Sequence, residues 1–228
     1  MDRRRYLAAL SGIGATAGCL GVNVGPFGGD GSANAYLDEP DREVDGSALP
    51  YPTYGDELPE VTVADPVAGR DVTTTAFDDR EVLMTFFYSH CNTVCPFLIS
   101  SLRSVKTAAV EGGYGDELAV LAVTFDPERD TADRLREYAE TMNVDLDADN
   151  WFFLRPETED RAKSVVQETF GVAFEKTGAT DSSMYMFNHL GLVVLVNRDG
   201  YVERAYSGDD PKADRIQRDL ETVRTRVA

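Results

Sequence analysis

The sequence predicts an α/β domain with a mixed central sheet, flanking helices, and a C-terminal β-hairpin followed by a helix. Two nearly continuous apolar runs, at 81–88 and 118–125, have the composition of strands that are buried on both faces. A stretch with helical spacing of apolar residues follows each run, and a turn sequence at 197–200 separates two further apolar runs. Strands that alternate with helices, followed by a hairpin, indicate a mixed sheet with helices on both of its faces.

The first half of the predicted domain alternates strand and helix. Pro96 suits a first helical turn, where its missing N–H removes a donor that has no partner anyway. Gly112-Gly113 and Gly171 mark helix ends, and Asp130 or Thr131 could cap a helix that runs to Met142. The expected elements are strands at 61–63 and 81–88, a helix at 96–111, a strand at 118–125, a helix from 130 or 131 to 142, a strand at 151–154 and a helix at 157–170.

The second half begins with two expected strands, at 184–187 and 192–196. The turn Asn197-Arg198-Asp199-Gly200 then leads into a strand at 201–206, which predicts an antiparallel hairpin. A closing helix is expected at about 211–226. This order of elements is that of a thioredoxin-like domain, which we place at 59–228.

The charge of the chain excludes one class of partner. There are 40 acidic and 22 basic residues, which give a formal net charge of −18 at pH 7. Such a surface repels phosphates, so no nucleic-acid partner is expected. The carboxylates are spread along the whole chain, as in halophilic proteins whose self-repulsion is screened by salt. We therefore attribute the charge to the environment of the protein and not to its function.

The first 19 residues read as an export signal. Arg3-Arg4-Arg5 precedes a short Ala/Gly-rich apolar stretch that ends at Cys19, which resembles a twin-arginine signal with a lipoprotein processing site. The alternative is an uncleaved membrane anchor, although the run is short for a spanning helix. Either arrangement predicts a protein at the outer face of the cytoplasmic membrane, held by a lipid or an anchor. Residues 20–58, rich in Gly, Asp and Pro, read as a flexible tether.

Cys91 and Cys95 are the cysteines that remain for the folded domain, and they lie where a buried strand meets a helix. Two thiols at such a corner can face one another, and the helix N-terminus favours their ionised forms. Outside the cytoplasm, two thiols without a function would oxidise to a disulfide bond. A disulfide that closes so short a loop would add little to the stability of the fold. The pair therefore indicates redox chemistry or the binding of a soft metal.

The chain has two histidines, and we expect different roles for them. Two thiolates and one imidazole form an adequate three-coordinate shell for monovalent copper. His90 adjoins Cys91, and neighbouring side chains diverge, so we interpret His90 as a structural group or an outer partner of the site. His189 lies on a later element that could fold back over the thiols, and we favour it as a ligand over a core histidine.

Asp126 follows the second buried strand. Because the carboxyl ends of adjacent parallel strands meet in one crevice, its carboxylate could reach the thiol site from outside the ligand shell and tune a ligand. Asp130 and Thr131, a few residues later, are explained as a turn and a helix cap.

Three ordered motifs resemble those of the SCO/SenC family, thioredoxin-fold proteins for the assembly of cytochrome c oxidase. They are Phe87–Cys91 followed by Cys95-Pro96, the segment 124–131, and a single late histidine before a hairpin. The likeness extends over about residues 60–226. It implies that Cys91, Cys95 and His189 bind copper, as Cu(I) or Cu(II), and that Asp126 supports metal binding or partner exchange.

The resemblance also implies an acceptor, which is the binuclear copper site of cytochrome c oxidase subunit II or another extracytoplasmic copper protein. The chain departs from the family at Asn188 and Leu190, where an Asp and a small hydroxyl residue are common. The expected function is thus that of a copper metallochaperone.

Two other interpretations remain open at the level of sequence. A thiol–disulfide oxidoreductase would use Cys91 as the attacking thiol and Cys95 as the resolving thiol, although such enzymes typically have two residues between their cysteines. Zinc would also accept two cysteines, one histidine and a water. A peroxidase is disfavoured by the paired thiols.

Overall fold

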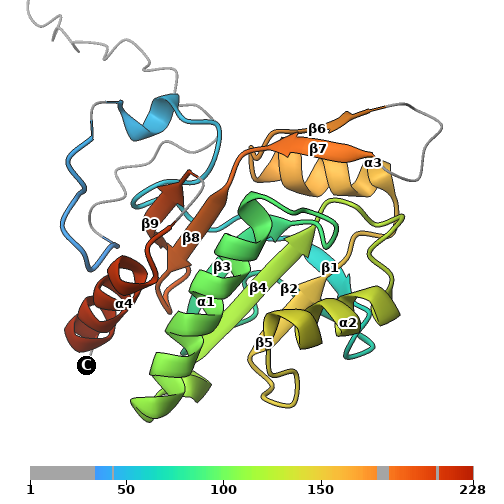
Figure 1. Cartoon of the computed structure of the whole chain (residues 1–228). Coiled ribbons are helices and arrows are strands. Elements are labelled where there is room, and N and C mark those ends of the chain that lie inside the picture. Colours follow the sequence, from blue (N-terminus) through green and yellow to red (C-terminus); the bar gives the residue numbers. More distant parts are fainter. Residues whose placement is uncertain (1–33, 43, 179–184, 209–210, 228) are drawn as a thin grey trace, which may run out of the picture.

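A five-stranded mixed sheet forms the centre of the computed structural model, which describes residues 34–42, 44–178, 185–208 and 211–227 (Figure 1). The strand order is β5-β4-β3-β8-β9. β3, β4 and β5 run parallel, whereas β8 is antiparallel to β3 and β9 is antiparallel to β8. The α/β class, the mixed sheet and the C-terminal hairpin are therefore confirmed. The strands span Glu81–Phe87 (β3), Leu118–Thr124 (β4), Trp151–Leu154 (β5), Leu192–Val196 (β8) and Val202–Ser207 (β9).

Helices cover both faces of this sheet because its inner strands are apolar on both sides. Every residue of β3 and β4 is buried. Successive side chains of a strand point to opposite faces, so Phe87 stacks on Tyr138 of one helix layer while Phe86 packs against Phe170 on the other side. Figure 1 shows α1 between α4 and α2 in front of the sheet. These helices span Val94–Glu111 (α1), Ala132–Met142 (α2) and Ala213–Val227 (α4).

The helix expected at 157–170 is divided. A short α-helix, α3 (Glu159–Ala162), continues as a π-helical segment, η4 (Lys163–Thr169), whose wider turns carry hydrogen bonds such as that from the Phe170 N–H to the Val165 carbonyl. Gly171 follows with a φ of +66°, and a Cβ at this position would lie 1.6 Å from the carbonyl oxygen of Pro50. Only glycine fits so close an approach.

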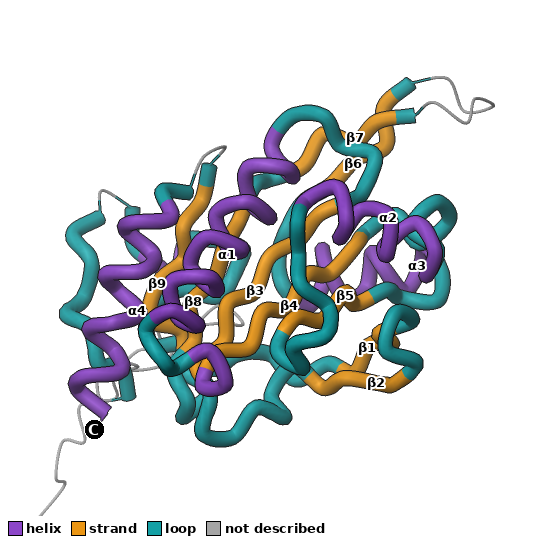
Figure 2. The backbone as a smooth tube through the Cα atoms, turned by 60° about the horizontal axis from the view of Figure 1, so that its bottom comes forward, coloured by secondary structure: helices purple, strands orange, loops and turns teal. Residues whose placement is uncertain are grey.

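Two small antiparallel pairs lie outside the central sheet (Figure 2). One joins β1 (Thr62–Asp65) to β2 (Arg70–Thr73), and the other joins β6 (Phe174–Thr177) to β7 (Met186–His189). We did not predict β2 or β6, because each is short and charged. The strand expected at 184–187 lies at 186–189, and Met184 is outside the described residues.

Part of the segment expected to be a flexible tether is packed on the domain. Leu37, Tyr51 and Leu58 are buried, and a short 3₁₀ turn spans Gly46–Ala48. The backbone N–H groups of Tyr36 and Leu37 donate to the buried carboxylate of Glu203 on β9, at 2.7 and 2.8 Å. Apolar side chains and a buried acceptor thus hold this segment, so the packed chain already includes residue 34 and not only residues from 59 onward.

The expected export signal, with Cys19, lies outside the described residues, as does the first part of the expected tether. Within the described part of the chain, no helix is both long and apolar enough to cross a membrane.

Candidate metal centre

The two thiols lie where the sequence predicts them, at the corner between β3 and α1. Cys91 precedes the helix and Cys95 is in its first turn, next to Pro96. The Cys91 N–H donates to the carbonyl of Tyr88 at 3.2 Å, which folds the loop back over the end of β3. The Cys91 residue is 6% exposed and Cys95 is fully buried. Both cysteines are free thiols, and Cys95 lies deeper below the surface than Cys91.

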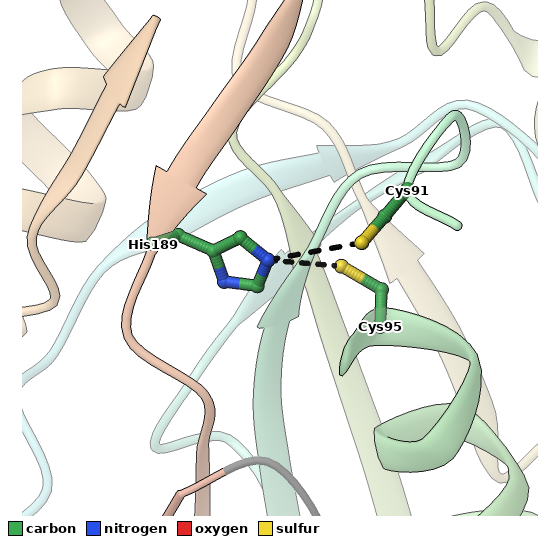
Figure 3. A group of neighbouring side chains, drawn as sticks. All are labelled: Cys91, Cys95 and His189. Carbon is green, nitrogen blue, oxygen red and sulfur yellow. Dashed lines mark hydrogen bonds between the residues drawn. The ribbon is translucent and has the colours of Figure 1, made fainter. Parts of the chain in front are cut away.

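His189 reaches these thiols from the last residue of β7 (Figure 3). Its Nε2 lies 3.4 Å from Cys95 Sγ and 3.9 Å from Cys91 Sγ. The ring of Phe125 packs against the imidazole with centroids 5.1 Å apart, and the Tyr88 ring meets it edge-on. Nδ1 is 3.3 Å from the carbonyl oxygen of Leu190, which can only accept a hydrogen bond. This contact favours a proton on Nδ1 and directs the lone pair of Nε2 at the thiols.

The three side chains fit a soft metal ion. Their ligand atoms, which come from residues far apart in the chain, all lie within 4.8 Å of one another. With bonds of about 2.0–2.3 Å, the lengths that imidazole and thiolate make to zinc, a planar three-coordinate ion would space its ligand atoms roughly 3.7 Å apart. The observed separations of 3.4 and 3.9 Å from the imidazole to the sulfurs lie on either side of that value. Two sulfurs with one imidazole are donors suited to monovalent copper.

The thiols differ in acidity. The hydrogen bond from the Cys95 thiol lowers the pKa of Cys91 far below its usual value, and the Thr93 hydroxyl adds a smaller contribution in the same direction. Burial raises the pKa of Cys95. We had expected the helix N-terminus to favour the ionised form of both. Instead, the pKa of Cys91 is lowered and that of Cys95 is raised, because the deeper sulfur is desolvated and its thiol donates a hydrogen bond to the sulfur of Cys91.

Asp126 is buried close to the site, but it contacts neither the thiols nor His189. Arg129 Nε donates to one carboxylate oxygen at 2.6 Å, and the Tyr185 hydroxyl donates to the other at 2.6 Å. Burial raises the pKa of Asp126, which these hydrogen bonds partly offset. The carboxylate of Asp126 is therefore hydrogen-bonded to Arg129 and Tyr185, which lie beside the site.

His90 lies outside the group formed by the thiols and His189. Its ring is exposed, and Nδ1 lies 3.2 Å from the Ser89 hydroxyl and 3.7 Å from the carboxylate of Asp130. A ring nitrogen of His90 and carboxylate oxygens of Asp126 and Asp130 lie within 4.8 Å of one another. This placement separates the two histidines, and the role of His90 as a structural group or an outer partner stays a prediction.

Sequence reasoning missed the role of Asp130. The cap of α2 is Thr131, whose side chain accepts from the Arg134 N–H. Asp130 is fully buried and accepts from the backbone N–H and hydroxyl of Ser89 and from the hydroxyl of Thr124. It thus ties the cysteine loop to the end of β4. The sequence signal for this role was the spacing of four residues between Asp126 and Asp130, which lets one turn of chain bring both carboxylates to the same side.

Known proteins are similar to this chain over most of its length. The sequence profile of the SCO1/SenC family matches residues 65–225. An SCO2-like protein of Rickettsia typhi is 23% identical over 128 residues, which cover 54% of this chain and 58% of that protein. The chain thus matches less than two thirds of the length of this curated relative.

Solved structures share the fold. BsSco, described as a member of the Sco family of cytochrome c oxidase assembly proteins, superposes with a TM-score of 0.60 at 22% identity, over 77% of this chain and 96% of that one. A SCO1/SenC family lipoprotein of Bacillus anthracis gives 0.61 at 18%, over 78% and 99%. Copper-bound ScoI of Bradyrhizobium japonicum gives 0.56 at 22%, over 72% and 98%. With its motifs, its thioredoxin-like sheet and the profile match over 65–225, the chain belongs to the SCO1/SenC family.

Proposed function

We propose that this protein is a copper metallochaperone that binds one copper ion through Cys91, Cys95 and His189. The observation that carries the proposal is the convergence of two sulfurs and one imidazole nitrogen within 4.8 Å. Nε2 faces both sulfurs, and the lowered pKa of Cys91 favours the thiolate that a metal ion requires, so little rearrangement is needed to admit the ion. The copper-bound relative from Bradyrhizobium japonicum supports copper over zinc.

The acceptor we propose is a copper protein outside the cytoplasm, with the binuclear site of cytochrome c oxidase subunit II as the first candidate. Cu(I) would pass to it by exchange of one ligand at a time, without a change in oxidation state. The description of BsSco as an oxidase assembly protein supports this role. The lipoprotein from Bacillus anthracis supports a membrane-tethered location, with Cys19 as the proposed site of lipid attachment.

A copper titration tests the site. The reduced protein without its predicted signal, residues 20–228 kept in high salt, would be titrated anaerobically with Cu(I) against a chromophoric competitor. We expect one tightly bound ion, with an affinity that falls at least about 100-fold in His189→Ala and in Cys95→Ser, because loss of even an outer partner of a ligand costs 10–100-fold. His90→Ala is the matched comparison, and because its ring lies outside the group formed by the thiols and His189 we expect a clearly smaller loss of affinity. Binding that is weak, or indifferent to His189, would remove the proposal.

The difference in pKa between Cys91 and Cys95 favours a second candidate function, that of a thiol–disulfide oxidoreductase. The Cys91 thiolate would attack a partner disulfide and release one partner thiolate, and Cys95 would then displace the other. The partner gains two electrons and becomes a dithiol, while Cys91 and Cys95 become a disulfide. This exchange needs both cysteines but not a metal ligand, so reduction of a disulfide peptide at an unchanged rate by His189→Ala would support it.

A further inference from the structure

One turn of chain after β4 contacts both halves of the candidate metal centre. The turn runs from Asp126 to Asp130 and is closed by a hydrogen bond from the Asp130 N–H to the Asp126 carbonyl, at 3.0 Å. Asp130 accepts from the backbone N–H of Ser89, two residues before Cys91. Asp126 accepts from the hydroxyl of Tyr185, four residues before His189. The two carboxylates thus hold the thiol loop and the histidine strand from a single short segment.

Tyr185 is held more firmly than one hydrogen bond would achieve. The guanidinium of Arg129 lies 3.6 Å from the centre of its ring, and the ammonium of Lys176 lies 3.8 Å from it. Nη1 of Arg129 also donates to the carbonyl of Tyr185 at 2.9 Å. Cation–π contacts of this kind add to the hydrogen bonds. The start of β7 is therefore fixed through side chain and backbone alike.

Asp126 acts on the site only through these neighbours. Both of its carboxylate oxygens are engaged, one by Arg129 and one by Tyr185, and the residue is fully buried. β7 pairs in the described residues with β6 alone and lies outside the central sheet. Its inner part is held at the end of the sheet by the Phe187 N–H, which donates to the Tyr88 hydroxyl at 3.3 Å, and by the ring contacts of His189. The contacts of Tyr185 add the anchor at the start of the strand, and the approach of His189 to the thiols depends on both ends.

We propose that Asp126, Arg129 and Tyr185 are positioning residues that set the separation of the imidazole from the two sulfurs. The Asp126–Asp130 turn serves as the spacer, with its Asp130 end on the cysteine loop and its Asp126 end on β7. The expected effect on copper affinity rests on the function proposed above. The expected effect on the position and mobility of β7 in the metal-free protein is independent of that function.

Tyr185→Phe tests this arrangement with the least disturbance, since it keeps the ring between its two cations and removes only the hydroxyl. In the metal-free protein, we expect amide exchange of residues 186–189 to become about tenfold faster. With Cu(I), we expect the affinity to fall about tenfold, within the range known for partners of metal ligands. In a His189→Ala background the same substitution should change the affinity less than twofold, because there is no imidazole left to position.

Tyr206→Phe is the matched control. Tyr206 is another buried tyrosine whose hydroxyl donates to a carboxylate, that of Asp219 at 2.7 Å, and it lies on β9. We expect it to lower thermal stability as Tyr185→Phe does while leaving copper affinity and exchange at β7 unchanged. Equal losses of affinity with and without His189, or exchange at 186–189 that does not respond to Tyr185→Phe, would overturn the positioning role. A wild-type protein that fails to bind Cu(I) would instead overturn the proposed function, and the exchange result would still decide the positioning role.

Discussion

His189 Nε2 lies 3.4 Å from the sulfur of Cys95, although 94 residues separate them in the chain. The contact joins the first turn of helix α1 to the last residue of strand β7, which lies outside the central sheet. A group of side chains assembled across such a distance exists only in the folded protein. We therefore expect the copper affinity that we propose to be lost when the protein unfolds.

The acidity of Cys91 predicts an unusual dependence of its reactivity on pH. A lowered pKa keeps the thiolate populated as the pH falls. Alkylation of Cys91 should therefore proceed at a nearly constant rate between about pH 8 and pH 6, whereas an ordinary thiol slows about tenfold per unit below its pKa. Cys95 should stay unmodified in the native protein. Mass spectrometry after iodoacetamide treatment measures both.

Cys95→Ser is the informative variant for this prediction. Cys95→Ala should be compared with it, because alanine removes the hydrogen bond that contributes most to the lowered pKa of Cys91, whereas the serine hydroxyl can still donate one. A stronger dependence on pH should therefore return in Cys95→Ala and less so in Cys95→Ser. A wild-type rate that already drops tenfold per unit would contradict the prediction.

The packed N-terminal segment predicts that the domain needs more than residues 59–228. A chain that starts at residue 59 loses the N–H groups of Tyr36 and Leu37, so the buried carboxylate of Glu203 keeps Asn197 as its remaining side-chain partner. Leaving a buried charge underpaired costs about 1.5–3 kcal/mol per hydrogen bond lost. We expect urea unfolding to show the chain from residue 59 to be less stable than the chain from residue 34 by about 3 kcal/mol or more.

Glu203→Gln provides the control for the truncation. A neutral amide is cheaper to leave without partners than a carboxylate, so the difference between the two chain lengths should shrink in this variant. A truncation that costs the same in the Glu203→Gln background as in the wild type would assign the loss to the buried Leu37 and Tyr51 instead.

Substitutions at Gly171 and Gly200 separate the cost of a positive φ from the cost of a steric overlap. Both have φ in the left-handed region, +66° and +87°, but a Cβ would meet nothing within 4 Å at Gly200 and would overlap the Pro50 carbonyl at Gly171. Gly200→Ala should cost about 1–2 kcal/mol for the backbone conformation alone. Gly171→Ala should cost clearly more and should expose residues 50–51 to proteolysis. Equal unfolding midpoints for the two variants would contradict this difference.

The aromatic contact across the rear face of the sheet predicts a third stability difference. Phe170 is fully buried with its ring centroid 5.3 Å from that of Phe86, whereas Phe97 on α1 is 58% exposed. Phe170→Ala should destabilise the protein by about 3–5 kcal/mol, and Phe97→Ala should stay within about 0.5 kcal/mol. Chemical denaturation of both variants measures this, and similar losses would show that the η4 segment does not pack as described.

The buried half of the molecule could be predicted from sequence because its patterns are strong. β3 and β4 are fully buried seven-residue strands of mostly apolar residues, and their order around Cys91 was enough to place the thiols at a strand–helix corner. β6 could not be predicted in the same way. Its Glu175 and Lys176 are exposed, and it exists as a strand because it pairs with β7.

The environment of Asp126 was also beyond sequence reasoning. Its partner Tyr185 is 59 residues away, and nothing in the local pattern distinguishes a tyrosine that binds a carboxylate from one that fills the core. The packing of residues 34–58 was missed for a similar reason, since its buried acceptor, Glu203, is contributed by β9.

The depth of the three proposed ligand atoms predicts an order for copper release. Cys95 has no exposed surface, Cys91 has little, and His189 is half-buried at the outer side. In the transfer we propose, an incoming ligand can therefore reach the ion only from the side of His189 and Cys91, and Cys95 is the last ligand to dissociate. The same opening would serve for loading and for release, and the acceptor would make its first bond to the ion before Cys95 breaks the last one.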